Sequence, residues 1–180
     1  MSVVAIQGVR GSYSEEAAVE LMGLNAEIVE CLDFPSTFDA VLKDRVRYAV
    51  VPIENKIVGE IAGSMNILRD SGLRVFEKLP LKVMHVLAGT ANAVIGSITQ
   101  IRSHVEALKQ CRQFLSSNPG WAQVIGADTA SSIRQVVETG EMEIAAIGSR
   151  RAAELYGAKI IAENIADDHD NWTTFYLVGK

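Results

Sequence analysis

The sequence predicts an α/β protein made of two lobes. Short apolar segments rich in valine and isoleucine alternate with amphipathic segments along all 180 residues. Glycines and helix-capping residues stand where one kind of segment gives way to the next. The segments also fall into two sets of similar size, with a boundary expected near residues 78–80. We therefore expect one domain, 1–180, with a first lobe over about 1–79, a second over about 80–180, and an interlobe cleft.

The first lobe opens on a β-branched apolar run at residues 2–7, which predicts a strand. Gly8 and Gly11 then predict a glycine turn. Ser14 is expected to cap the following helix, because Glu15 and Glu16 in its first turn suit the helix dipole. Further strands are expected at 27–31 and at 48–52, which ends on a proline, and further helices at 36–42, capped by Ser36, and at 63–71.

The second lobe is expected to hold six strands and three helices. The helix at 105–115 would place Leu108, Cys111 and Phe114 on one apolar face. The two later helices would end at Gly140 and Gly157, which favour helix termination. The expected strands are 82–87, 101–103, 123–125, 143–147, 159–165 and 174–178, and the expected helices are 105–115, 130–139 and 150–156.

Composition and charge exclude several classes of protein. The 17 Lys+Arg against 22 Asp+Glu give a net charge of −5, which argues against a nucleic-acid binder. No apolar run approaches the ~20 residues of a membrane span, and the N-terminus lacks a secretion signal. We therefore expect a cytoplasmic protein that binds neither nucleic acid nor membrane. Cys31 and Cys111 are expected to be free thiols, since two cysteines form no disulfide framework or metal cage.

Five polar segments stand at strand ends or helix starts, where open α/β sheets bind ligands. In the first, glycines let the backbone approach a ligand, and the helix start that follows favours an anion. A plain strand-to-helix turn, a solvated loop and a capping His104 are the alternative interpretations of the first three. The segments are 8–14, 52–56, 103–104, 128–132 and 171–175.

Familiar nucleophile and metal patterns are absent from the sequence. No serine lies in a Gly-x-Ser-x-Gly elbow, and Cys111 falls on the apolar face of its helix. His85, His104 and His169 lack the spacing of metal ligands. Spacing alone therefore predicts a two-lobed α/β protein that binds a small anion.

Taken together, the five segments resemble the catalytic domain of the prephenate dehydratase family, which includes the closely related arogenate dehydratases. Residues 8–14 (GVRGSYS) are similar to the family's Gly-x-x-Gly-Thr-Phe/Tyr-Ser turn, and residues 51–55 (VPIEN) to its Val-Pro-Ile-Glu-Asn-Ser segment. Residues 103–111 (SHVEALKQC) are similar to its Ser-His-Pro…Ala-Leu…Gln-Cys segment. Residues 129–130 fit its Thr-Ala turn, and residues 171–175 (NWTTF) its Asn-x-Thr-Arg-Phe motif.

The resemblance implies two α/β lobes like those of the type II periplasmic-binding-protein-like fold, with the active site between them and no cofactor or metal. Prephenate would lose carbon dioxide and hydroxide together and become phenylpyruvate, in phenylalanine biosynthesis. Thr173 would give the departing hydroxyl its proton, with Glu54 and Asn55 as the other catalytic residues. The residues expected to bind the dicarboxylate, prephenate or arogenate, are Gly8, Gly11, Ser12, Lys56, Ser103, His104, Thr129, Ala130, Thr174 and Phe175.

Three positions depart from the family's pattern. Thr174 stands where the family has arginine, Lys56 where it has serine, and Val105 where it has proline. A cation lost at Thr174 and gained at Lys56 would preserve the charge of the site if both side chains reach the same space. The family's carboxy-terminal domain, which senses phenylalanine, is not part of residues 1–180, so these residues are a free-standing catalytic domain, a piece of a longer protein or a relative with another role, and feedback through that domain is not expected here. A homodimer is expected, because oligomers are common in the family.

Two other functions remain open at this point. One is a related prephenate decarboxylase that does not form an aromatic ring, and the other is a non-catalytic module that binds a small anion. Retention of Glu54, Asn55 and Thr173 favours dehydration. The product formed from prephenate would separate the three.

Overall fold

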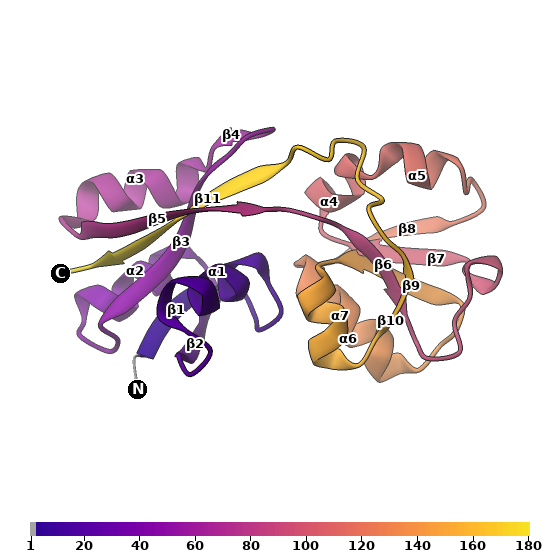
Figure 1. The fold of residues 1–180 in the computed structure, drawn as a ribbon, viewed down its shortest axis with the longest axis horizontal. Coiled ribbons are helices and arrows are strands. Elements are labelled where there is room, and N and C mark those ends of the chain that lie inside the picture. The colour runs from indigo at the N-terminus through magenta and orange to yellow at the C-terminus, as the bar shows by residue number, and fades with distance from the viewer. Residues whose placement is uncertain (1–2) are drawn as a thin grey trace. The chain divides into compact units, whose positions relative to one another are not determined.

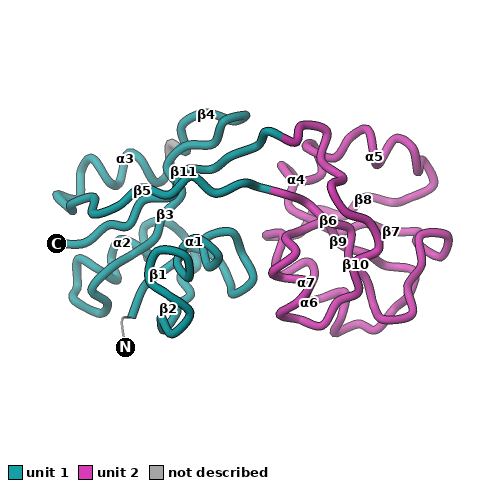
Figure 2. Tube along the Cα trace, in the orientation of Figure 1, with its two compact units in different colours: residues 1–83, 170–180 teal, residues 84–169 magenta. Residues whose placement is uncertain are grey.

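The computed structural model describes residues 3–180 and divides into two compact units (Figures 1 and 2). Unit 1 comprises the chain up to Val83 together with Asp170–Lys180, and unit 2 is Met84–His169. Each unit has its own β-sheet and its own apolar core. The prediction of two α/β lobes is therefore confirmed.

Unit 1 is built on a mixed sheet with the strand order β2-β1-β3-β11-β5. The first three strands of this order run parallel, and β11 runs antiparallel to both of its neighbours. The carboxyl ends of β1, β2, β3 and β5 therefore meet the amino end of β11 at one edge. The strands are β1 (Val3–Gln7), β2 (Glu27–Cys31), β3 (Tyr48–Asn55), β5 (Arg74–Lys82) and β11 (Trp172–Gly179), with the short β4 (Gly59–Glu60) beside β3.

Helices cover both faces of this sheet (Figure 1). On one face, α1 (Tyr13–Met22) buries Ala17 and Ala18 against Phe175 and Leu177 of β11. On the other face, α2 (Phe34–Leu42) and α3 (Ala62–Ser71) share a core with alternate residues of β3 and β11. We call the first the α1 face. It matters for the site, because side chains on one strand alternate between the two faces.

Unit 2 contains a second mixed sheet with the order β10-β6-β9-β7-β8. Its centre is parallel, so the carboxyl ends of β7, β8 and β9 lie at one edge, and each leads to a helix. The strands are β6 (Val86–Gly89), β7 (Gln100–Ser103), β8 (Ala122–Ile125), β9 (Ile144–Gly148) and β10 (Lys159–Ala162). The helices are α4 (Val105–Gln110), α5 (Arg112–Ser116), α6 (Thr129–Thr139) and α7 (Arg150–Tyr156), with a 3-10 turn at Ile95–Ser97.

The division of the chain differs from a simple split near residue 80. The chain passes into unit 2 after Val83 and returns to unit 1 at Asp170. Residues 170–180, expected in the second lobe, belong to unit 1 because β11 lies between β3 and β5 along its whole length. Ser2, which the sequence places in the first strand, lies outside the described residues.

Several strands differ from their expected bounds, including β10, which ends at Ala162 rather than at residue 165, and β11, which begins at Trp172 rather than at residue 174. The strand expected at 82–87 is two strands, since β5 ends at Lys82 and β6 begins at Val86 in the other sheet. Pro52 does not end β3, which continues to Asn55. The register against β11 shifts at this point, because Phe175 lies opposite Pro52 and Thr174 opposite Glu54. A proline, which lacks an N–H, is tolerated at such a bulge.

Several helices begin or break elsewhere than expected. Ser12 rather than Ser14 caps α1, and its hydroxyl accepts a hydrogen bond from the Glu15 amide. Asp33 rather than Ser36 caps α2, and Ser36 completes a reciprocal capping box. The helix expected at 105–115 breaks at Cys111, whose φ of −116° is not helical. None of the described helices has the length and apolarity needed to cross a membrane.

Candidate active site

The candidate site of unit 1 lies at the sheet edge where β1, β3 and β5 end and β11 begins. Gly8, Gly11 and Ser12 follow β1, Glu54 and Asn55 end β3, and Thr173 is the second residue of β11. Thr173 and Asn55 are direct cross-strand partners. The sheet thus brings together three segments that are distant in sequence.

A hydrogen-bonded network of two asparagines and a threonine forms the centre of this edge. The Asn55 Nδ2 donates to Thr173 Oγ1 at 2.8 Å and to Asn171 Oδ1 at 2.8 Å. The Asn55 Oδ1 accepts from the amides of Ile57 at 2.9 Å and Val58 at 3.0 Å. Backbone N–H groups can only donate, so the orientation of the Asn55 amide is fixed.

Within this network, the Thr173 hydroxyl remains able to donate a hydrogen bond to a bound molecule. Its oxygen accepts from Asn55, and among the described residues its proton has no acceptor. Thr173, Asn55 and Asn171 are all buried, which strengthens each hydrogen bond relative to one in water. The arrangement can therefore hold a hydroxyl proton toward a bound molecule.

A bulge in β3 aligns this pair. Thr174 is opposite Glu54 and Phe175 is opposite Pro52, so Ile53 is an extra residue of β3 that has no partner on β11. The register of β11 against β5 is regular from residue 172 to 177, which puts Thr173 on the same face as Phe175 and Leu177. Thr173 therefore lies on the α1 face, with Asn55 beside it.

In the glycine turn between β1 and α1, three backbone amides donate hydrogen bonds to acceptors within the protein. The Gly8 amide donates to the Cys31 carbonyl at 2.8 Å, and the Ser12 amide to the Val9 carbonyl at 3.2 Å. The Gly11 amide donates to the Glu15 carboxylate at 2.6 Å. Gly8 and Gly11 have φ values of +97° and +88°, which glycine adopts without strain. The glycines shape the turn, and their amides are engaged internally rather than open to an anion.

Arg10 and Glu15 in this turn were missed by sequence reasoning. Glu15 is fully buried, and its carboxylate holds the Gly11 amide and, at 3.2 Å, the Nε of Arg10. The Arg10 side chain is 58% exposed. A charged residue between two glycines at the start of a helix was the available signal.

Lys56 and Thr174 lie in different settings. The Lys56 ammonium forms an exposed ion pair with Asp170. The pKa of Asp170 is lowered, first by the Lys56 hydrogen bond and then by that from the Trp172 indole. Thr174 alternates onto the face opposite Thr173. That Lys56 replaces a cation lost at Thr174 stays a prediction.

Two other expected site residues of unit 1 have distinct surroundings. Glu54 is exposed at the end of β3, opposite Thr174 and Glu60. Phe175 is 2% exposed and packs in the core under α1. It lies on the same face of β11 as Thr173, and a direct contact with substrate stays a prediction.

Unit 2 gathers the remaining expected residues at the carboxyl edge of its parallel strands. Ser103, the last residue of β7, is fully buried and donates to the Ile147 carbonyl of β9 at 2.7 Å. His104 caps α4, since its Nδ1 accepts from the Glu106 amide at 3.3 Å. The interpretation of His104 as a capping residue therefore fits the geometry.

The start of α6 occupies the same edge of unit 2. Asp128 caps the helix by accepting from the Ser131 amide at 2.7 Å, and Thr129 is its first residue. Ala130 is fully buried and offers no polar side chain. A Cβ at Gly126 would come within 2.3 Å of the Ser132 hydroxyl, so glycine is required for this close approach of helix and strand.

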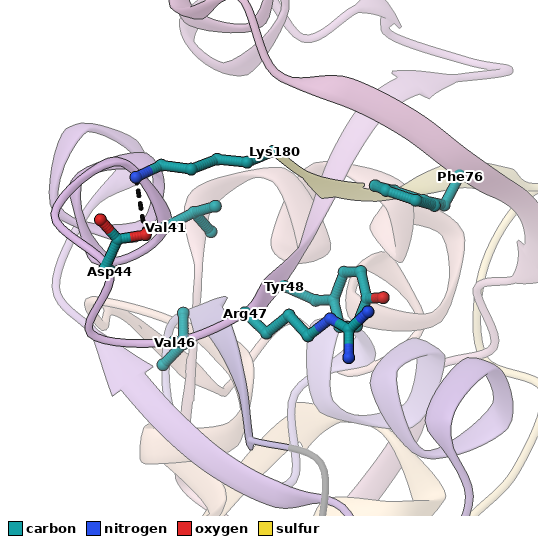
Figure 3. Close-up of a pocket in the computed structure, with 7 residues that line it drawn as sticks. All are labelled: Val41, Asp44, Val46, Arg47, Tyr48, Phe76 and Lys180. Atoms are coloured by element: carbon teal, nitrogen blue, oxygen red, sulfur yellow. Dashed lines mark hydrogen bonds and ion pairs between the residues drawn. The ribbon is translucent and has the colours of Figure 1, made fainter.

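A pocket of about 170 Å³ in unit 1 lies at the other end of the same strands (Figure 3). Its walls include Tyr48 at the start of β3 and Phe76 near the start of β5, whose rings meet edge to face at 5.3 Å. Lys180 bridges to Asp44 above it. None of the catalytic or substrate-binding residues expected from the sequence lines this pocket.

Metal and thiol chemistry find no support among residues 3–180. The side chains described there form no group of three or more that could hold a metal ion. Burial raises the pKa of Cys111 to about 12, so its nucleophilic thiolate form is scarce at neutral pH. The site is one of hydroxyl, amide and charged groups.

Comparison with known proteins places these motifs in one family. Residues 4–180 match the family model described as prephenate dehydratase. This chain belongs to the prephenate dehydratase family. The network of Asn55 and Thr173 therefore lies in the two motifs by which the sequence resembles prephenate dehydratases.

Relatives support the family and also extend beyond this chain. Arogenate dehydratase/prephenate dehydratase 1, chloroplastic, of Arabidopsis thaliana is 37% identical over 98% of this chain and 45% of its own length. A crystal structure of prephenate dehydratase in complex with L-Phe from Arthrobacter aurescens is 26% identical, with a TM-score of 0.90 over 99% of this chain and 60% of that one. The chain thus spans about half the length of the curated prephenate dehydratase relatives it matches.

Other solved structures share the fold. A protein described as a novel type of quorum-quenching acylase is 29% identical, with a TM-score of 0.86 over 99% of this chain and 64% of that one. A putative methionine-binding lipoprotein from Bacillus subtilis has a TM-score of 0.52 at 11% identity, over 99% of this chain and 83% of that one. An ABC transporter periplasmic substrate-binding protein from Coxiella burnetii has a TM-score of 0.51 at 12% identity, over 100% of this chain and 85% of that one. These last two likenesses concern the fold alone, and they confirm the expected fold class.

Proposed function

We propose that this chain is a carbon–oxygen lyase that converts prephenate to phenylpyruvate, with arogenate as a second possible substrate. Membership of the prephenate dehydratase family supports the reaction class. The observation that carries the proposal is the Thr173 hydroxyl, whose oxygen accepts from Asn55 at 2.8 Å. Its proton is thereby kept for an acceptor that the substrate would supply.

The proposed reaction needs one proton at one place. The bond from the ring carbon to its carboxylate breaks, its electron pair completes the aromatic ring, and carbon dioxide leaves. The ring hydroxyl departs at the same time and takes a proton to become water. Thr173 would hydrogen-bond to that hydroxyl and supply the proton, with Asn55 stabilising the threonine oxygen as charge develops.

A threonine hydroxyl is a weak acid, so most of its proposed contribution to catalysis comes from its fixed position. Asn55 makes four hydrogen bonds, and Asn171 is one of its acceptors. Locking a donor in advance lowers the barrier because little reorganisation is left for the reaction itself. Glu54, Ser103, His104 and Thr129 complete the proposed set from two sheet edges, and the expected interlobe cleft that would join them stays a prediction.

Steady-state assays with each substrate test the proposal. The chain is incubated separately with prephenate and arogenate, and the aromatic product is identified by chromatography. Phenylpyruvate from prephenate, or phenylalanine from arogenate, supports the dehydratase. A non-aromatic keto acid from prephenate would indicate the decarboxylase, and tight binding of prephenate without turnover would indicate a binding module.

We further propose a cytoplasmic homodimer. The sequence feature that supports this location is the absence of an apolar run long enough to span a membrane. Sedimentation or light scattering on the purified chain tests the dimer, and a monomer at micromolar concentration would contradict it.

A further inference from the structure

We propose that Arg10, held by the buried carboxylate of Glu15, binds a carboxylate of the substrate that Thr173 protonates. This inference rests on the proposed function and names a substrate-binding residue within it. Prephenate and arogenate each carry two carboxylates. Arginine binds a carboxylate through two parallel N–H groups, which fixes both position and orientation.

Arg10 lies at the edge and on the face where Thr173 lies. The turn that carries Arg10 connects the carboxyl end of β1 to the start of α1. Tyr13, the first residue of α1, packs on the cluster that includes Leu81 and Phe175. Leu81 is the partner of Thr173 on β5. The start of α1 therefore adjoins the strand pair that presents Thr173.

Two lysines at this edge are placed differently from Arg10. Lys82 is opposite Trp172 on β5, so it alternates away from the α1 face. Lys56 follows β3, and its partner Asp170 is 65% exposed. Exposed ion pairs hold their groups weakly. Neither lysine combines the α1 face with a rigid partner.

Glu15 gives Arg10 the rigidity that the lysines lack. Its carboxylate is 1% exposed, and its two oxygens hold separate donors, the Arg10 Nε at 3.2 Å and the Gly11 amide at 2.6 Å. The Arg10 amide in turn donates to Glu30 at 2.6 Å. Backbone and side chain of Arg10 are thus both anchored, while 58% of the side chain stays accessible to solvent and to a ligand.

The hydrogen bonds of the glycine turn also favour Arg10 as the group that binds the carboxylate. Its Gly8, Gly11 and Ser12 amides already have acceptors in the protein. The turn therefore presents a guanidinium to an anion rather than a nest of backbone amides. Glu15 acts here as a positioning residue, and Arg10 as the group that contacts substrate.

The test compares Arg10→Gln with Arg10→Lys by steady-state kinetics on prephenate and arogenate. Loss of a charge-assisted hydrogen bond should raise KM by about tenfold to a hundredfold, with kcat within a few-fold of the unmodified chain. Arg10→Lys keeps the charge without the fork and should recover part of the loss. A KM for Arg10→Gln within twofold of the unmodified chain would overturn the proposal.

Two further variants, Arg69→Gln and Lys56→Gln, show whether the effect on KM is specific to Arg10. Arg69 is 59% exposed and bonded to Glu60 at 3.0 Å, but α3 carries it on the opposite face, so Arg69→Gln should leave KM unchanged. Equal losses in Arg69→Gln and Arg10→Gln would show a general charge effect and refute a specific contact. A loss in Lys56→Gln in place of Arg10→Gln would assign the carboxylate to Lys56 instead.

Positioning by Glu15 is tested in the double variant. Glu15→Gln should raise KM, and should add little in the Arg10→Gln background, because it acts through Arg10. A purely structural role would lower the melting temperature and add fully in the double variant. If the unmodified chain converts neither substrate, the proposed function fails, and calorimetric titration with prephenate still decides whether Arg10→Gln weakens binding.

Discussion

Thr173 is the residue on which the proposed chemistry depends most. Its hydroxyl oxygen accepts from Asn55, and the amide of Asn55 is oriented by the amides of Ile57 and Val58. These hydrogen bonds fix the weakly acidic Thr173 hydroxyl in place as a hydrogen-bond donor.

Thr173→Val keeps the shape of the side chain and removes the hydroxyl. Because the proton is needed in the transition state, kcat should fall by about 10²- to 10⁴-fold, while KM changes less. Steady-state kinetics with prephenate measure both. A loss under about fivefold in kcat would assign the proton to another group. Thr173→Ser, which keeps the hydroxyl, serves as the control and should retain most of the activity.

At the scale of elements, the site depends on where helices begin. The start of α6 is fixed by Asp128, which accepts from the amide of Ser131 at 2.7 Å, and by the absence of a side chain at Gly126. These contacts place Thr129 at the carboxyl edge of β7 and β9. The cap should therefore have a measurable effect on stability.

Asp128→Ala removes the cap and leaves the first amides of α6 without their acceptor. We expect the free energy of unfolding to fall by about 1 kcal/mol, measured by urea denaturation. Glu141→Ala, an exposed acid in the same unit, is the control and should change stability by less than half of that amount. Equal effects of the two changes would mean that the cap contributes nothing specific.

Element boundaries show where sequence reasoning works and where it stops. Periodicity located α6 and α7, because glycines end both helices and a strand precedes each. It missed most of β5, since residues 74–80 are largely exposed and show no apolar alternation. It also ended β3 at Pro52, because the bulge that accommodates the proline depends on the distant β11. Local signals cannot reveal a register set by a strand more than 100 residues away.

The candidate site was predicted to a similar degree. The sequence motifs named both Asn55 and Thr173, and the structure shows these two residues as direct cross-strand partners. Arg10 and Glu15 were overlooked, because an ion pair within a turn has no sequence pattern of its own. The sequence also does not show that the Gly11 amide is bonded to Glu15 and the Gly8 amide to the Cys31 carbonyl, and the expected contacts of both glycines with substrate stay predictions.

At the scale of the whole molecule, stability should depend on pH through His85 in unit 2. The side chain is 3% exposed, and its Nε2 bonds to Gln110 at 2.9 Å. Burial lowers the pKa of His85 below the ordinary 6.5, although the Gln110 bond opposes this. The folded chain therefore resists protonation that the unfolded chain accepts.

The sign of the effect follows from that difference. Well above pH 6.5, His85 is neutral in both states and contributes no pH dependence. As the pH falls below it, the unfolded state gains a proton and the free energy of unfolding decreases, by up to about 1.4 kcal/mol per pH unit. Urea denaturation from pH 8 to 5 should show this slope, and His85→Gln should reduce it. An unchanged slope in His85→Gln, or an equal reduction in the exposed control His169→Gln, would contradict the assignment.

The central claim is that this chain couples loss of carbon dioxide to loss of hydroxide at Thr173. The most direct test measures carbon dioxide and phenylpyruvate together as the unmodified chain consumes prephenate. The account predicts equal amounts of both, released at the same rate, and a parallel fall of both rates in Thr173→Val. Carbon dioxide released without an aromatic product, or binding of prephenate without release of either, would contradict it.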